Sequence, residues 1–176
     1  MESDTAANQS PSTSPAPATS PTDAPPRITA LFCTDGSGLS LQALCRARHV
    51  VREPARVVVA TVVDAEDPVT VSGLGHTAAV LSPSDLERIS RERIDEGHRV
   101  LERTVAELGC GHAETVVLQG DAGVELVHLA ESISASVIVA GTRGRGGWRR
   151  AVLGSVSDHL VRHAPCPVLT VHVDEA

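Results

Sequence analysis

Short apolar runs alternate along this chain with longer stretches in which apolar residues recur every three or four positions. The short runs predict five strands, at residues 28–33, 56–63, 113–118, 136–140 and 167–173. The longer stretches predict four helices, at residues 40–51, 84–108, 121–134 and 154–163. A helix therefore separates each strand from the next, which predicts right-handed crossovers and a parallel sheet in an α/β fold.

Local signals set the ends of these helices. Ser84 and Asp121 are predicted N-caps, and Gly109 with Gly111 is predicted to end the long helix. The third helix is expected to bury four apolar side chains, those of Val124, Leu126, Leu129 and Ile133.

The beginning of the chain differs in composition from the rest. Residues 1–26 are rich in Pro, Ser, Thr and Ala and contain no basic residue. Such a segment buries too little apolar surface to offset the entropy of ordering. We therefore expect a disordered tail at 1–26 and one domain at 27–176, and a docking or phosphorylation role for the tail is left open.

Composition excludes several classes of function. The 176 residues include one Phe, one Trp and no Tyr, so base stacking on exposed aromatic residues is disfavoured. All 15 basic side chains are arginines. Without lysine, a Walker A loop, a protein kinase and Schiff-base chemistry are excluded. The net charge of −7 also argues against a nucleic-acid partner.

The four cysteines are Cys33, Cys45, Cys110 and Cys166. They lie far apart without a Cys-x-x-Cys pair, so we expect reduced, mostly buried thiols rather than a zinc site. No apolar run reaches transmembrane length, and the N-terminal residues do not resemble a secretory signal. A cytoplasmic protein without a membrane partner is the simplest expectation.

The clearest chemical signal is a glycine-rich segment between a predicted strand and a predicted helix. It reads Gly141-Thr142-Arg143-Gly144, then nine residues, then Gly154-Ser155. Glycine lets the backbone approach an anion, and the free N–H groups at a helix start hold it. Four arginines lie in or beside the segment: Arg143, Arg145, Arg149 and Arg150. These features favour a phosphate-binding loop over a simple long turn.

This spacing resembles the nucleotide-binding pattern of the universal stress protein family, in its single-domain form with an ATP-binding motif. The similarity continues in Thr34-Asp35-Gly36-Ser37 after the first strand and in Ala164-Pro165-Cys166-Pro167-Val168-Leu169 near the end. It covers about residues 27–173.

The resemblance implies a three-layer sandwich, Rossmann-like and of the adenine nucleotide alpha hydrolase-like type, with strand order 3-2-1-4-5. Ligands of such sheets bind where the strand order reverses, here between the first and fourth strands. The family places ribose near Asp35, adenine near the backbone of Val62, and phosphates on the glycine segment. The implied binding residues are Asp35, Val62, Gly120, Gly141, Arg143, Gly144, Gly154, Ser155, Val156 and Ser157.

The sequence thus predicts an ATP-binding regulatory protein of a nucleotide-dependent stress response, holding ATP with Mg²⁺. No set of residues suited to activating water is evident, so hydrolysis should be slow. Two alternatives remain: a slow ATP hydrolase or nucleotidyl-transfer enzyme of the same fold group, and an interaction module that binds no nucleotide. A protein partner is left open. The apolar strand at 167–173, at the edge of the implied sheet, is expected to form a homodimer.

Some motifs carry a second interpretation. Asp35 also suits a turn or helix cap, and Gly120 suits a turn before a helix, where Ala122 replaces the family's usual proline. The Gly-x-Gly-x-x-Ala pattern at 73–78 lies too far past its strand to bind a dinucleotide. His159 and His163 have metal-binding spacing, but His163 is expected to interact with the last carbonyls of its helix.

Overall fold

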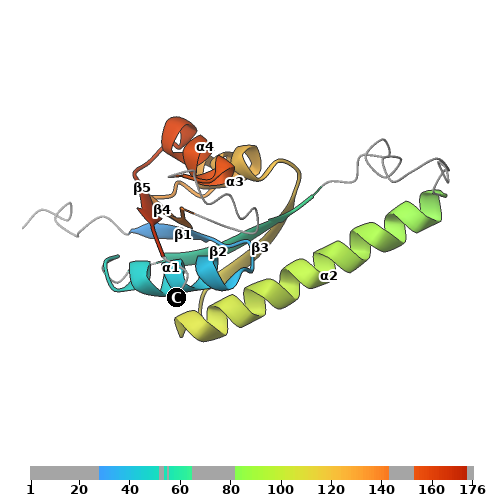
Figure 1. Cartoon of the computed structure of the whole chain (residues 1–176), viewed down its shortest axis with the longest axis horizontal. Helices are drawn as coiled ribbons and strands as arrows, with labels where there is room; N and C mark the ends of the chain where they lie inside the picture. Colours follow the sequence, from blue (N-terminus) through green and yellow to red (C-terminus); the bar gives the residue numbers. More distant parts are fainter. Residues whose placement is uncertain (1–27, 52–53, 55, 65–81, 143–152, 174–176) are drawn as a thin grey trace, which may run out of the picture.

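The computed structural model describes residues 28–51, 54, 56–64, 82–142 and 153–173. Strands and helices alternate through this part of the chain (Figure 1). The strands are β1 (Thr29–Cys33), β2 (Arg56–Val63), β3 (Glu114–Gln119), β4 (Val137–Gly141) and β5 (Val168–Val171). The helices are α1 (Gly38–Arg48), α2 (Pro83–Leu108), α3 (Ala122–Ser132) and α4 (Ser155–His163).

The five strands form one parallel sheet in the order β3-β2-β1-β4-β5. This confirms the implied strand order. β1 lies in the centre, between β2 and β4. The strand order reverses here, because β2 and β3 lie on one side of β1 and β4 and β5 lie on the other. The first and fourth strands are therefore neighbours, as a ligand site at the reversal requires.

Helices cover both faces of the sheet, because successive residues of a strand face opposite sides. Phe32 of β1 belongs to a core cluster with Leu44 of α1 and Leu101 of α2. Leu31, the preceding residue, belongs to a second cluster with Leu126 of α3 and Leu160 of α4. Figure 1 shows the same division, with α1 and α2 on one side and α3 and α4 on the other. The predicted three-layer sandwich is confirmed.

The start of α2 differs from the prediction. Ser82, not Ser84, is the N-cap: its hydroxyl accepts from the Asp85 N–H, and the Asp85 carboxylate accepts from the Ser82 N–H. Pro83 fits the first turn because its missing N–H would have no helical partner there. These reciprocal bonds form a capping box. Gly109 ends the helix in the left-handed conformation, as predicted.

The ends of α1 and α3 also show where the helical pattern was misleading. α1 begins at Gly38 after the Ser37 cap and ends at Arg48, earlier than the predicted span at both ends. Asp121 caps α3 as predicted. Val124, however, is 37% exposed rather than buried. It lies in the first turn of α3.

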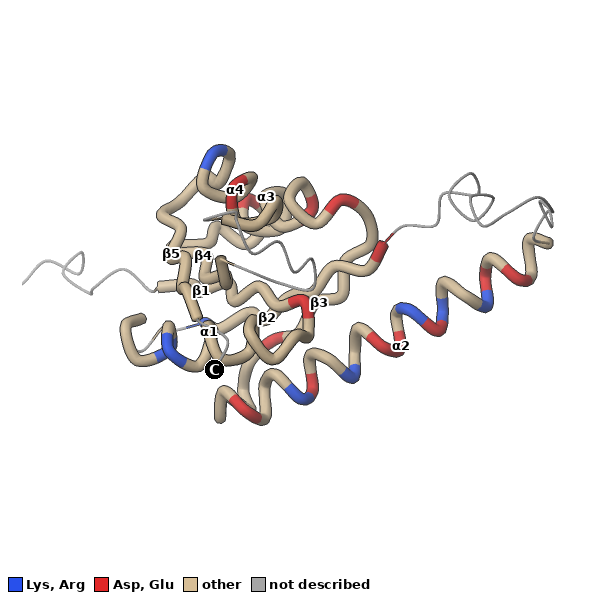
Figure 2. The backbone as a smooth tube through the Cα atoms, in the orientation of Figure 1, with Lys and Arg blue, Asp and Glu red and all other residues tan. Residues whose placement is uncertain are grey.

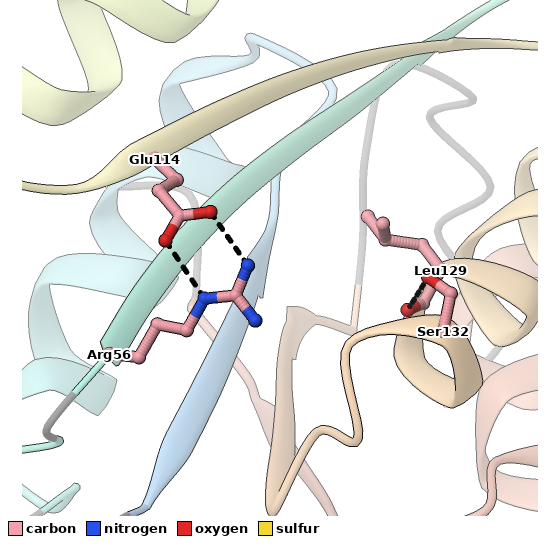
Figure 3. A network of polar contacts seen from close by, with 4 residues as sticks. All are labelled: Arg56, Glu114, Leu129 and Ser132. Carbon is pink, nitrogen blue, oxygen red and sulfur yellow. Dashed lines mark hydrogen bonds and ion pairs between the residues drawn. The ribbon is translucent and has the colours of Figure 1, made fainter.

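Ion pairs supplement the packing at the surface. The Arg56 guanidinium donates two hydrogen bonds to the Glu114 carboxylate, at 2.8 and 2.7 Å, and so joins β2 to the edge strand β3 (Figure 3). Arg56 lowers the pKa of Glu114 below its usual value, because the paired carboxylate is favoured in its charged form. Figure 2 shows acidic and basic residues alternating along α2, where pairs such as Arg88 with Glu92 form within the helix.

Candidate functional site

Backbone N–H and C=O groups of β2 and β4 face the space beyond the end of β1. β1 ends at Cys33, opposite Ala60, whereas β2 continues to Val63. Along a parallel ladder the backbone groups of successive residues face alternate neighbours. Ala60 accepts from Thr34 N at 2.9 Å, so the backbone of Val62 also faces the β1 side, past the last β1 residue.

The same reasoning applies to β4. Thr142 N donates to Val171 O of β5 at 3.0 Å, so the backbone of Gly141, one residue earlier, faces the opposite side, toward β1. Val62 and Gly141 therefore point backbone polar groups toward each other across the end of β1. We call Asp35, Val62, Gly141, Gly154 and Ser155 the β1-end site.

The turn after β1 carries Asp35. The Asp35 Oδ1 atom accepts from Ser37 N at 3.0 Å, and the Thr34 hydroxyl accepts from Gly36 N at 3.1 Å. Gly36 has a φ of 78°, a left-handed conformation that glycine adopts without strain. The Ser37 hydroxyl then caps α1 by accepting from Ser40 N. Asp35 is thus a turn residue and also lies beside the end of β1, so the two interpretations of this residue are compatible.

The start of α4 is built differently from the other helix starts. Gly154 is its N-cap and provides no side-chain cap, whereas Ser37, Ser82 and Asp121 cap the other described helices. Gly154 N donates to Thr142 O at 2.7 Å, which places the helix start beside the end of β4. The first N–H groups of a helix have no partner within it, so they and the helix dipole suit an anion.

The remaining residues predicted for the site fall into three groups. Ser155 and Val156 lie in the first turn of α4, and the Ser157 hydroxyl donates to Gly154 O at 3.0 Å. Gly120 follows β3 and donates to Val63 O at 3.1 Å, so it lies beyond β2 rather than between β1 and β4. Arg143 and Gly144 lie outside the described residues, as does the segment at 73–78.

Thr142 links the β1-end site to the last strand and was not among the predicted residues. Only 7% of it is exposed. Its Oγ1 lies 2.9 Å from His172 Nδ1, and its backbone binds both Val171 and Gly154. The position of Thr142, a polar residue directly after an apolar strand, was an available signal in the sequence. Its contact with His172 was not, because the two residues are 30 positions apart. Arg103, which donates to Gly36 O, gave no local signal at all.

The cysteines and histidines offer no competing site in the part of the chain that the structure describes. Burial, and to a lesser extent the neighbouring Cys166, raises the pKa of the Cys33 thiol, which disfavours a nucleophilic thiolate. His163 Nδ1 lies 2.9 Å from His159 O, confirming its predicted interaction with a helix carbonyl. Among the described residues no three His, Cys, Asp or Glu side chains are grouped for metal binding.

No described helix combines the length and apolar character needed to cross a membrane.

Comparison with known proteins agrees with the architecture. Residues 29–172 match the Universal stress protein family. The Bacillus subtilis universal stress protein YxiE is 35% identical over 145 residues, which make up 80% of this chain and 96% of YxiE.

Two solved structures extend the comparison. The universal stress protein UspA from Lactobacillus plantarum shares the fold, with a TM-score of 0.64 and 20% identity over 82% of this chain and 97% of that one. A universal stress protein solved in complex with cAMP has a TM-score of 0.54 and 26% identity, covering 84% of this chain and 98% of its own.

Proposed function

This chain belongs to the universal stress protein family, and on that premise we propose that it is a regulatory protein that binds ATP at the β1-end site. The observation that carries the proposal is the convergence of three features around the end of β1. These are the inward-facing backbones of Val62 and Gly141, the turn that carries Asp35, and the start of α4 at Gly154.

Each feature suits one part of the nucleotide. The Val62 backbone offers one N–H donor and one C=O acceptor, the pair that an adenine edge complements. The Asp35 carboxylate accepts hydrogen bonds from ribose hydroxyls. The N–H groups of Ser155 and Val156 suit phosphate oxygens. The relative that was solved with cAMP also supports an adenine nucleotide as the ligand.

Mg²⁺ would reach the protein with the phosphates. Mg²⁺ in nucleotide sites is commonly held by phosphate oxygens with one or two carboxylates rather than by a complete protein cage. Asp35 is the carboxylate of the β1-end site, and no cluster of three metal-binding side chains occurs in the described residues. The donor set therefore fits Mg²⁺ bound to ATP and does not fit a metal held by protein alone. When bound, Mg²⁺ would neutralise phosphate charge.

The decisive experiment is to denature the purified protein and identify any released nucleotide by chromatography and mass spectrometry. The apoprotein is then titrated with ATP, AMP and cAMP in the presence and absence of Mg²⁺. We expect adenine nucleotide in the released fraction, and tightest binding for ATP with Mg²⁺. Absence of binding to all three would refute the proposal. Turnover of ATP far above the rate without protein would favour the enzyme alternative.

We also propose that the protein acts as a homodimer joined through β5. β5 is an edge strand and pairs with β4 on one side. An apolar edge is a template for pairing with another chain, and a second copy about a two-fold axis satisfies both edges. Light scattering tests this state.

A further inference from the structure

Arg103 reaches from α2 to the turn that carries Asp35. Its Nη2 atom donates to the Gly36 carbonyl oxygen at 2.9 Å, across 67 positions of sequence. This bond ties the long helix on one face of the sheet to the β1-end site.

One planar peptide transmits the contact. The Gly36 carbonyl that accepts from Arg103 and the Ser37 N–H belong to the same peptide unit, which is planar and rotates as a whole. The Ser37 N–H donates to Asp35 Oδ1 at 3.0 Å. Fixing the carbonyl end of the peptide therefore fixes the donor that orients the carboxylate.

The turn needs such a restraint. Gly36 has a φ of 78° and lacks a side chain, so the peptide after it is free to rotate over a wider range than in other residues. The nearby bonds from Gly36 N to Thr34 and from Ser40 N to Ser37 restrain other peptides of the turn. Arg103 restrains the Gly36–Ser37 peptide, whose N–H donates to Asp35.

We propose that Arg103 is a positioning residue for ribose recognition: it holds the Gly36–Ser37 peptide and thereby sets the direction of the Asp35 carboxylate. This inference rests on the proposed function. It implies that Arg103 determines how strongly the protein distinguishes a nucleotide that has ribose hydroxyls from one that lacks them.

The test compares calorimetric affinities for ATP and for 2′,3′-dideoxy-ATP. We expect the unmodified protein to favour ATP by about tenfold or more, the effect of one hydrogen bond to a charged group. Arg103→Ala should reduce this ratio to about threefold or less, with little change in affinity for the dideoxy nucleotide. Arg103→Lys should restore part of the ratio, because an ammonium group also donates to a carbonyl.

Arg99→Ala is the matched control. Arg99 is an exposed arginine one turn earlier on α2, and its guanidinium pairs with Glu96 within the helix. It should keep the ratio of the unmodified protein. An equal loss of affinity for both nucleotides in Arg103→Ala would show a general charge or folding effect and overturn the inference. An unchanged ratio would overturn it as well, as would an unmodified protein that binds both nucleotides equally.

A measurement without ligand separates this inference from the proposed function. Hydrogen exchange of the Ser37 amide should be several-fold faster in Arg103→Ala than in Arg99→Ala, because the peptide loses its anchor. Equal exchange in the two variants would refute the positioning role, even if both proteins bind ATP. Failure of the unmodified protein to bind any nucleotide would instead refute the proposed function.

Discussion

At the scale of single residues, position after a strand was the informative signal. The sequence could place Asp35 and Gly141 at one edge of the sheet, because the carboxyl ends of parallel strands meet there. Their roles in binding stay predictions. Arg103 and His172 could not be placed in this way, because their partners lie far along the chain. Arg103 contacts Gly36, 67 positions away, and His172 contacts Thr142, 30 positions away. Val62 was predicted from the family resemblance, and the hydrogen-bond register shows that its backbone faces the β1 side, as the proposed role requires.

The glycine motif gives a prediction at this scale. Gly144→Val would place a branched side chain in the segment where the proposed function requires close approach of phosphate to the backbone. We expect at least about tenfold weaker ATP binding, the size of one lost charge-assisted hydrogen bond. Gly111→Val is the control, since a Cβ atom at Gly111 meets nothing within 4 Å. Calorimetry and circular dichroism together would refute the assignment if Gly144→Val binds ATP like the control.

At the scale of elements, helix starts depend on which polar groups can complete a set of bonds. The Ser82-Pro83-Ser84-Asp85 segment contains two candidate caps, and each has an acidic residue three positions later, Asp85 for Ser82 and Glu87 for Ser84. A cap at Ser82 also places Pro83 at the first helical position, which proline favours. This signal was available in the sequence. The exposure of Val124 was less accessible, because apolar spacing does not show which side of a first turn faces the sheet.

The contact between α3 and α4 depends on a glycine, Gly123, which leaves room for the His159 ring. A Cβ atom on Gly123 would lie 2.7 Å from Cγ of the His159 ring. Gly123→Ala should therefore destabilise the protein by about 1–3 kcal/mol, the usual effect of overpacking. Gly38→Ala, in α1, meets nothing within 4 Å and should leave stability unchanged or slightly raised. Denaturant unfolding of both variants checks this, and equal stabilities would contradict the packing argument.

The pair between β2 and β3 predicts a pH dependence. Arg56 lowers the folded-state pKa of Glu114, so the pair stabilises the fold above the ordinary glutamate pKa and loses this effect as pH falls through the lowered value. Glu114→Gln should slightly lower the melting temperature at neutral pH, and the difference should vanish in acid. The effect is small because both side chains are exposed. A difference that persists at low pH would point to packing instead.

At the scale of the whole molecule, the strand order and the edge position of β5 followed from the family resemblance combined with strand–helix alternation. The sequence did not show which β5 residues direct their backbone N–H and C=O groups away from β4. Pro167 O accepts from Ile138 N and Val171 O accepts from Thr142 N, so odd-numbered residues of β5 face β4. Thr170 therefore turns its backbone to the open edge.

This alternation gives the test for the homodimer. Thr170→Pro removes an N–H from the outer edge and should yield a monomer by light scattering, with nearly unchanged melting temperature. Val171→Pro removes an N–H that faces β4 and should lower the melting temperature instead. A monomeric unmodified protein at micromolar concentration would rule out the proposed dimer, as would a Thr170→Pro variant that remains fully dimeric.

The central position of β1 also has a consequence for folding kinetics. β1 and β4 are joined by contacts between residues as far apart as Thr29 and Ser136, 107 positions along the chain. Closing so long a loop is slow compared with forming the neighbouring β1–β2 contact. We therefore expect the two halves of the β1-end site to meet late on the folding pathway. If so, the contacts of a bound nucleotide would be absent from the transition state, and we expect the nucleotide to slow unfolding without accelerating refolding.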